Sequence, residues 1–442
     1  MGFVQFAGNH FFEIAATMPG ITSIDVKTLK LARKLVLQRC DELGLVSDAP
    51  DQLTRLFCSP AMANAHQLLS HWMQQAGLQT HLDAVGNLIG CSSRDESKPV
   101  LIIGSHLDTV INAGKFDGTL GVLLGLAVAE VIQQNEIELP FALHVVAFSE
   151  EEGVRFGYPF IGSRGMAGSF DIDSFDRQDR EGTSMYQALK SFGCMPEDFR
   201  SASYAASPER PGSNVVGFIE AHIEQCDRLQ DSDIPCGVVS SIAGQTRATF
   251  EFRGKAGHAG TVPHEKRKDA VAAAAELILE IETLGRKTEG LFATVGNIYS
   301  SPGLSNVISG RAVVQLDLRH EDDSIRIDCF NKILSSLNRI ADQRNITAEV
   351  VDRQDDAAVP MDARLKQCFL QAIEEEGLET KTMVSGAGHD AMIMSNVAPP
   401  CMLFIRCNNG ISHHPDESVM PQDVQVSIKV MIGAILKLAE NF

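Results

Sequence analysis

The chain has 442 residues, of which 44% are hydrophobic and 21% charged, the composition of a globular protein with room for two or three domains. Its formal net charge of −19 argues against nucleic acid or an anionic membrane surface as a partner. The charge does not exclude a small anionic ligand, because a local cationic site can outweigh a diffuse negative field.

Several features of the sequence bear on the cellular compartment. The ten cysteines include no C-x-x-C pair, which favours reduced thiols over disulfides or a zinc–thiolate cluster. No Lys or Arg precedes Lys27, so the N-terminus lacks the charged start of a signal peptide. The longest apolar run, near Val122–Val131, contains Glu130 and is too short to span a bilayer. We therefore expect a soluble, cytoplasmic protein that does not contact membranes.

The first third of the chain alternates strand and helix patterns. The run Val100–Ile103 predicts a buried strand, Thr119–Gln134 an apolar helix, and Phe141–Phe148 a second strand. This order is typical of an α/β fold with a mainly parallel sheet, whose ligands gather beyond the carboxyl ends of the strands. His106 and the acids from Glu150 onward both follow such ends, so we expect them to share one crevice.

The pattern changes near Cys236, where strands with alternating polar and apolar residues begin to flank two helices. We predict an inserted α+β domain at residues 237–353, within a main domain formed by residues 1–236 and 354–442. Residues 201–214 resemble a surface loop. Later elements are expected at Lys268–Leu284, Ser324–Arg344, Asp362–Glu376 and Val424–Ala439 (helices) and at Pro399–Cys407 (strand).

The segment GSHLDTVINAGKFDG, residues 104–118, follows the first strand with a histidine and two aspartates. His106 and Asp108 are two residues apart, so on an extended chain their side chains share a face. A metal-binding histidine usually donates its other ring N–H to a carboxylate, which makes His106 a candidate ligand and Asp108 its orienting partner. Asp117 precedes the predicted helix and could equally be a ligand or a helix cap.

Four further segments carry metal-binding residue types. They are FSEEEGVRFG with Glu150, Glu151 and Glu152, FIEAHIEQ with Glu220, His222 and Glu224, GAGHDA with His389 and Asp390, and GISHHPDE with His413 and His414. Each segment alone is weak evidence, because exposed glutamates and isolated histidines are common. Together, the histidines and carboxylates could hold two divalent ions about 3.5–4 Å apart. These residue types suit zinc, manganese or cobalt, but they do not show which of the three glutamates binds a metal ion.

One family has these motifs in the same order. The chain resembles the ureidohydrolase branch of the metal-dependent aminoacylase/carboxypeptidase superfamily in GSHLDTVINAGKFDG, FSEEEGVRFG, HIEQ, GHAGTVP, SNVISG, DLRH, GAGHDA and GISHHPDE. The branch contains allantoate amidohydrolases, N-carbamoyl-L-amino-acid hydrolases and β-ureidopropionases. The similarity runs from LTRLFCSP, near residue 53, to the end of the chain. It implies a di-metal catalytic domain with an inserted dimerisation, or lid, domain.

The resemblance also implies a ligand set for two divalent ions, zinc or manganese. One ion would be bound by His106, Asp117 and His222. The other would be bound by Asp117, Glu152 and His413, so that Asp117 bridges the two ions.

The three consecutive glutamates then have different roles. The resemblance makes Glu151 the general base, which takes a proton from a metal-activated water and delivers it to the leaving nitrogen. Glu150 is expected to be a partly exposed acid at the end of a strand.

Four more residues receive roles through the resemblance. His258 would reach the active site of the other subunit of a homodimer, formed through the inserted domain, and stabilise the oxyanion. Arg319 and Asn306 would hold the carboxylate of a small anionic ureido substrate. Gln225 would contact its ureido group.

The sequence departs from the family pattern at a few positions. Cys226 and Asp227 replace a Gly-Pro pair, His264 replaces a Met, and His414 stands where Asn or Ser is common. These departures bear on the shape of the pocket, and the roles of His264 and His414 stay open.

The finer motifs AGKFDG, GVRFGYPFIGS, IAGQTR and GAGHDAM favour the allantoate amidohydrolases of the branch. We expect hydrolysis of one ureido group of allantoate to give ureidoglycine, ammonia and carbon dioxide. The main alternative is an N-carbamoyl-L-amino-acid hydrolase or β-ureidopropionase, followed by a peptidase or a non-catalytic binder. HIEQ and GHAGTVP argue against a peptidase, and the presence of Glu151 with a full ligand set argues against a binder.

Overall fold

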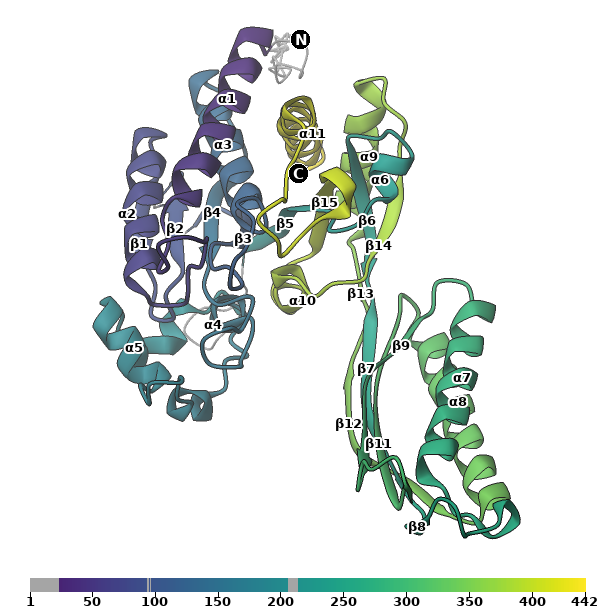
Figure 1. The fold of residues 1–442 in the computed structure, drawn as a ribbon. Helices are drawn as coiled ribbons and strands as arrows, with labels where there is room; N and C mark the ends of the chain where they lie inside the picture. Colours follow the sequence, from purple (N-terminus) through teal and green to yellow (C-terminus); the bar gives the residue numbers. More distant parts are fainter. Residues whose placement is uncertain (1–23, 94, 96, 206–213) are drawn as a thin grey trace, which may run out of the picture.

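The computed structural model describes residues 24–93, 95, 97–205 and 214–442 (Figure 1). Residues 206–213 of the expected surface loop lie outside this range, as does the N-terminal segment up to residue 23. No helix in the described ranges combines the length and the apolar character needed to cross a bilayer.

The main domain is built on a sheet that has nine strands among the described residues. In order across the sheet they are β1 (Gln79–Leu82), β2 (Leu88–Cys91), β4 (Ala142–Phe148), β3 (Val100–His106), β5 (Val215–Ile223), β15 (Pro400–Ile405), β6 (Cys236–Ile242) and β13 (Val359–Pro360), with β14 (Thr382–Ser385) paired to β6. The four central strands, β4, β3, β5 and β15, run parallel. Antiparallel pairs lie toward the two edges. The predicted α/β fold with a mainly parallel central sheet is confirmed.

Helices cover both faces of this sheet (Figure 1). One face packs against α1 (Val26–Gly44), α2 (Pro60–Gln75), α3 (Thr119–Gln134), α9 (Ala363–Glu375) and α11 (Pro421–Glu440). The other face is covered in part by the short helices α4 (Ile161–Met166) and α10 (Asp390–Met394). α3 is buried on almost all sides, because it lies between the sheet and the helices α1 and α11. Its nearly continuous apolar sequence follows from that position.

A second, smaller sheet projects from the main domain (Figure 1). Its antiparallel strands lie in the order β12 (Thr347–Asp356), β7 (Gly244–Arg253), β11 (Arg311–His320) and β9 (Phe292–Ser301). The helices α7 (Ala270–Lys287) and α8 (Asp323–Arg344) cover one face and share an apolar core with it. A short ladder of β8 (Gly257–His258) and β10 (Val307–Ile308) lies at the end far from the main domain (Figure 1).

The pairing of strands places β6 differently from the sequence prediction. The segment from residue 237 was predicted to belong to the insert, but β6 pairs with β15 and β14 of the central sheet. Only Ala243 separates β6 from β7, so the chain passes from one sheet to the other without a turn that the sequence could reveal. On the return, β12 continues to Asp356 before β13 rejoins the central sheet. The division into domains at residues 237 and 353 remains a prediction.

Candidate metal centre and active site

Segments far apart in the sequence meet at the carboxyl edge of the parallel strands, where neighbouring strands end side by side. The side chains gathered there are His106 at the end of β3, Asp117 before α3, Glu151 and Glu152 after β4, His222 near the end of β5, and His413 between β15 and α11. Adjacent strands therefore supply the histidines and acids that the sequence analysis singled out.

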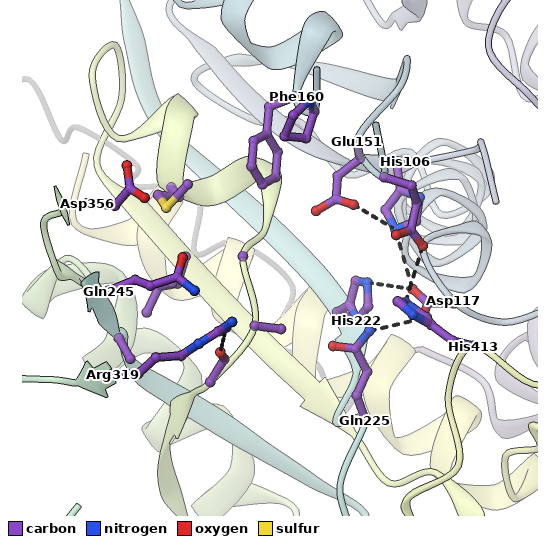
Figure 2. Close-up of a pocket in the computed structure, with 18 of the residues that line it drawn as sticks. His106, Asp117, Glu151, Phe160, His222, Gln225, Gln245, Arg319, Asp356 and His413 are labelled. Atoms are coloured by element: carbon purple, nitrogen blue, oxygen red, sulfur yellow. Dashed lines mark hydrogen bonds and ion pairs between the residues drawn. The ribbon is translucent and has the colours of Figure 1, made fainter. Parts of the chain in front are cut away.

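Asp117 lies at the centre of this cluster (Figure 2). Its Oδ1 is 3.4 Å from Nε2 of His106 and 3.1 Å from Nε2 of His222. Its Oδ2 is 3.4 Å from Nε2 of His413, and that nitrogen is 3.3 Å from Oε1 of Glu152. Two groups of possible ligands thus share Asp117, and within each group the donor atoms lie within 4.8 Å of one another.

Hydrogen bonds define which ring nitrogen of each buried histidine is free. Nδ1 of His106 lies 3.0 Å from the backbone oxygen of Asp108, and Nδ1 of His222 lies 2.9 Å from that of Ile223. A carbonyl oxygen only accepts, so in the neutral rings Nδ1 carries the hydrogen and the Nε2 lone pairs face Asp117. Oδ1 of Asp117 is buried and, among the described residues, receives no hydrogen bond. Lone pairs that converge in this way need a cation between them, so the donor set fits a divalent metal ion.

The electrostatics of the cluster agree with this fit. Burial would raise the pKa of Asp117, but His222, His106 and His413 outweigh it and hold that pKa well below its ordinary value. Hydrogen bonds to Asp117, and then to Glu152, raise the pKa of His413 to about 10. The site therefore attracts positive charge, and a metal ion competes with protons for the same lone pairs.

Asp108 makes contacts other than the predicted one. The sequence predicts that its carboxylate accepts the ring N–H of His106, but Oδ1 lies 3.7 Å from Nδ1. The backbone oxygen of Asp108 takes that contact, because the chain turns as it leaves β3. The carboxylate instead accepts the backbone N–H groups of Glu151 and Glu152, at 3.0 and 3.1 Å. Asp108 thus holds the loop that carries Glu151 and Glu152.

Glu151 faces the cleft beside the cluster (Figure 2). Its Oε2 lies 4.0 Å from Nε2 of His106, and the residue is only 9% exposed. Burial raises the pKa of Glu151 well above its ordinary value; His106 opposes the shift, and Glu152 adds to it. A carboxyl group with a raised pKa binds a proton more readily than an ordinary glutamate does.

Glu150 is fully buried, so the prediction of a partly exposed acid is wrong. Its Oε1 accepts the backbone N–H of Arg155 at 2.8 Å. Burial raises the pKa of Glu150 to about 8. The physical reason is the turn after β4: Glu150 has a φ of 48°, which folds its side chain under the loop instead of toward solvent.

Two supporting residues were missed by the sequence analysis. The hydroxyl of Ser412 hydrogen-bonds to Oδ2 of Asp117, as does Nε2 of Gln225 at 3.0 Å. Glu417 accepts the backbone N–H groups of Phe116 and Asp117 at 2.7 and 2.9 Å. The sequence signal for Ser412 and Glu417 was their position beside the histidines of GISHHPDE. Gln225, which was expected to contact substrate, here also contacts the central aspartate.

A cleft of about 330 Å³ separates the cluster from the inserted sheet. Arg319 lines its far wall (Figure 2). Nε and Nη2 of Arg319 donate to Asp317 at 2.7 and 2.9 Å, and Nη1 donates to the backbone oxygen of Gly386 in the main domain. The guanidinium therefore sits where the two sheets face each other.

His258 and Asn306 do not join the cluster within one chain. His258 is on β8 and Asn306 directly precedes β10, at the far end of the inserted sheet (Figure 1). The backbone oxygen of Asn306 accepts the N–H of Ala259 at 3.0 Å. His258 is exposed, and its Nδ1 accepts the N–H of Gly260 at 3.1 Å. Neither side chain lines the cleft.

The two histidines whose roles stayed open also lie away from Asp117. His414 is exposed, and its Nδ1 accepts the N–H of Asp416 at 3.2 Å. His264 is exposed in a short helical turn and does not line the cleft. Of the two adjacent histidines, His413 is the one that faces Asp117.

A family model supports the interpretation of this geometry. The model described as "Peptidase family M20/M25/M40" matches residues 102–437. The chain belongs to this family. Its members are metal-dependent hydrolases, so the family confirms the resemblance inferred from the motifs and agrees with the buried groups that could hold metal ions.

Individual relatives narrow the similarity further. An allantoate deiminase of Arabidopsis thaliana is 37% identical, over 89% of this chain and 80% of its own. An N-carbamoyl-L-amino-acid amidohydrolase of Pseudomonas sp. (strain NS671) is 35% identical, over 93% of this chain and 100% of its own. A crystal structure of an amidase of the hydantoinase/carbamoylase family from Burkholderia multivorans is similar with a TM-score of 0.84 at 28% identity, covering 92% of this chain and 98% of that one. The M20 chain thus has relatives with both of the activities that the motifs suggested.

Proposed function

We propose that this protein hydrolyses one ureido group of allantoate. Hydrolysis of its terminal C–N bond releases ammonia, and the carbamate that remains loses carbon dioxide to give ureidoglycine. The observation that carries the proposal is the pair of ligand groups that share Asp117, with Arg319 on the opposite wall of the same cleft. Allantoate has a carboxylate and two ureido groups on one carbon, so it can span a cationic centre and a guanidinium. The Arabidopsis relative named as an allantoate deiminase supports this choice of substrate.

Two divalent ions, zinc or manganese, complete the proposed site. His106, Asp117 and His222 would hold one ion, and Asp117, Glu152 and His413 the other. Imidazole and carboxylate ligands accept either metal. Such ions, when bound, lower the pKa of a water molecule and polarise a carbonyl oxygen.

Glu151 acts as the general base in this proposal. Its carboxylate takes a proton from the attacking water and passes it to the leaving nitrogen. Two observations support the role: the carboxylate lies beside His106 at the edge of the cleft, and its raised pKa suits a group that must take up a proton.

The remaining polar groups of the cleft position the substrate. Arg319 would hold the carboxylate through a planar, charge-assisted pair of hydrogen bonds. Gln225 would contact the ureido group that is cleaved, since its amide lines the cleft next to Asp117. Asp108 would keep Glu151 and Glu152 in place through their backbone N–H groups.

We propose a homodimer formed through the inserted domain, in which His258 and Asn306 of the partner subunit complete the site. The support is the edge of the smaller sheet, where β9 is unpaired on its outer side among the described residues. Phe292 and Tyr299 on this strand are each 58% exposed, and Leu279 on the neighbouring α7 is 62% exposed. An exposed edge strand with apolar side chains is a common pairing surface.

We also propose a cytoplasmic location, with neither nucleic acid nor a membrane as a partner. The cysteines, at all ten positions in the described chain, are free thiols, which suits a reducing compartment. The net charge of −19 disfavours polyanions.

The second candidate activity is hydrolysis of N-carbamoyl-L-amino acids or of β-ureidopropionate. The Pseudomonas relative, similar over its whole length, favours it. The same ligands and base would serve, because these substrates also have a ureido group and a carboxylate.

An assay of ammonia release decides between the two substrates. The manganese-loaded protein is compared on allantoate and on a series of N-carbamoyl-L-amino acids. We expect kcat/KM to be at least about tenfold higher for allantoate, the scale of discrimination that a few polar contacts provide. A preference for an N-carbamoyl-L-amino acid would overturn the choice of allantoate.

A further inference from the structure

Three neighbouring strands of the inserted sheet form the wall of the cleft opposite the metal-ligand cluster. Asp356 on β12 is in register with Gln245 on β7, and Gln245 is in register with Arg319 on β11. Side chains in register on adjacent strands project from the same face. All three line the cleft (Figure 2) and form a row of acid, amide and base, with about 5 Å between strands.

Part of this row is already engaged by Asp317. Its carboxylate accepts both hydrogen bonds from Arg319 and another from Nε2 of Gln245, at 2.6 Å. The amide nitrogen of Gln245 donates to Asp317, so its amide oxygen is the atom that can accept a hydrogen bond from a substrate.

Asp356 has weak contacts by comparison. It is partly buried and receives a hydrogen bond from Nε2 of Gln354 at 3.5 Å. In the part of the chain that the structure describes, it forms no ion pair with Lys, Arg or His. The Asp356 carboxylate and the Gln245 oxygen are therefore two neighbouring acceptors on this wall, which Arg247 and Gln354 also line.

Hydrogen-bond acceptors in this cleft need hydrogen-bond donors on the substrate, although the substrate is an anion. A second carboxylate would be repelled by Asp356, and an alkyl group would leave the carboxylate without a hydrogen bond. A ureido group can bind to these two acceptors. It is planar, and along one edge its N–H groups lie side by side, as those of a guanidinium do when it binds a carboxylate.

We propose that Asp356 and Gln245 bind the second ureido group of the substrate, the one that is not cleaved. This inference rests on the proposed function. The reacting ureido group lies at the metal-ligand cluster, the carboxylate at Arg319, and the remaining ureido group at Asp356. Asp356 then determines specificity, because an N-carbamoyl amino acid with an alkyl side chain lacks this third arm.

The test is the substrate preference of Asp356→Asn. Steady-state kinetics are measured for wild type and variant on allantoate, N-carbamoyl-L-alanine and N-carbamoyl-L-lysine. We expect kcat/KM for allantoate to fall by about 10- to 100-fold, mainly through KM, the range for hydrogen bonds to a charged group. The value for N-carbamoyl-L-alanine should stay within about twofold, because that substrate does not reach Asp356. Asp352→Asn, on an exposed position of the same strand, is the control and should match wild type.

The results distinguish this inference from the proposed function. If wild type does not hydrolyse allantoate, the proposed function fails. If wild type hydrolyses allantoate but Asp356→Asn loses the same factor on allantoate and N-carbamoyl-L-alanine, Asp356 only supports the fold and the inference alone is overturned. A wild-type preference for N-carbamoyl-L-lysine that disappears in the variant would also overturn it, because the subsite would then bind an ammonium group.

Discussion

Glu150 and Glu151 are adjacent in the sequence, yet their surroundings suit them to different tasks. Glu150 is buried under the loop after β4 and hydrogen-bonded to its backbone. Glu151 faces the cleft next to His106. The first residue therefore shapes the loop, and the second is the one that we propose as the general base.

The proposed base can be tested by Glu151→Gln. The amide has nearly the same shape but cannot accept a proton, so we expect kcat to fall by about 10²- to 10⁴-fold. The metal content should stay at the wild-type value, because other residues form the groups that share Asp117. Ammonia release and elemental analysis check both statements, with the exposed Glu138→Gln as a control. Unchanged turnover would mean that Glu151 is not the base.

Glu417 provides a second test at the scale of one residue. Glu417→Ala removes the acceptor of two buried backbone N–H groups, at Phe116 and Asp117. We expect the free energy of unfolding to fall by about 1–3 kcal/mol and metal affinity to weaken about 10- to 100-fold. Glu417→Gln keeps an acceptor oxygen and should restore most of both.

Denaturant titration and metal competition with a chelating dye measure these effects. The exposed neighbour Asp416→Asn is the matched control. Equal metal affinity for Glu417→Ala and wild type would show that Asp117 does not depend on this support.

Among the elements, α3 shows how a buried charge is accommodated. Glu130 lies on this helix and is 7% exposed. Arg39 of α1 donates to it twice, at 3.0 and 2.7 Å, and its guanidinium lies 5.3 Å from the centre of the Trp72 ring. The acid that interrupts the apolar run in the sequence is therefore the point at which α1 is tied to α3.

Breaking this pair should destabilise the main domain. Glu130→Gln leaves Arg39 buried without a counter-charge, so we expect the free energy of unfolding to drop by about 3 kcal/mol. Urea unfolding followed by circular dichroism measures the change, with the exposed Glu138→Gln as a control. A loss no larger than that of the control would mean that the pair contributes nothing net.

The sequence predicted helices and strands most accurately where a single hydrophobic pattern extends over the whole element. The bounds of α3 were predicted at Thr119 and Gln134, because a long and mostly apolar helical pattern has a clear start and end. β6 pairs with strands of the central sheet although the sequence pattern placed its residues in the insert, because sheet membership depends on partners that are remote in sequence. Similarly, residue chemistry pointed to His106 and Asp117, but only the family resemblance chose among the glutamates. Glu417 was missed because its role depends on a contact with the backbone of Asp117, 300 residues away.

In the whole molecule, a single chain does not form the complete site that we propose, because that site includes His258. His258 lies at the far end of the inserted sheet, so only a second chain could bring that histidine to the cleft in this arrangement (Figure 1). The proposed dimer therefore predicts that assembly and catalysis are linked.

A charge on the edge strand should separate the subunits. Tyr299→Lys on β9 places a cation on the proposed interface, so we expect a monomer that retains its metals but loses about 10²- to 10³-fold in kcat, the cost of a missing oxyanion donor. Light scattering and ammonia release measure the two effects. The control is Val351→Lys, which places the same cation on β12, the edge strand on the opposite side of the sheet. This variant should remain dimeric and active.

Mixed dimers test the shared site directly. Glu151→Gln and His258→Ala chains are each expected to be inactive, but a dimer of one with the other contains one intact site. Random reassembly of equal amounts should restore about a quarter of wild-type activity, since half of the dimers are mixed and each has one working site. Absence of recovery in confirmed mixed dimers would place His258 outside the active site.

Every role proposed for this site depends on a pair of divalent ions joined by Asp117. The most direct measurement is elemental analysis of the active, purified protein, combined with turnover before and after chelation. We predict two divalent transition-metal ions per chain, loss of turnover on chelation, and recovery on adding manganese or zinc. Full activity in protein that contains no metal ion, unaffected by the chelator, would contradict a catalytic role for metal ions.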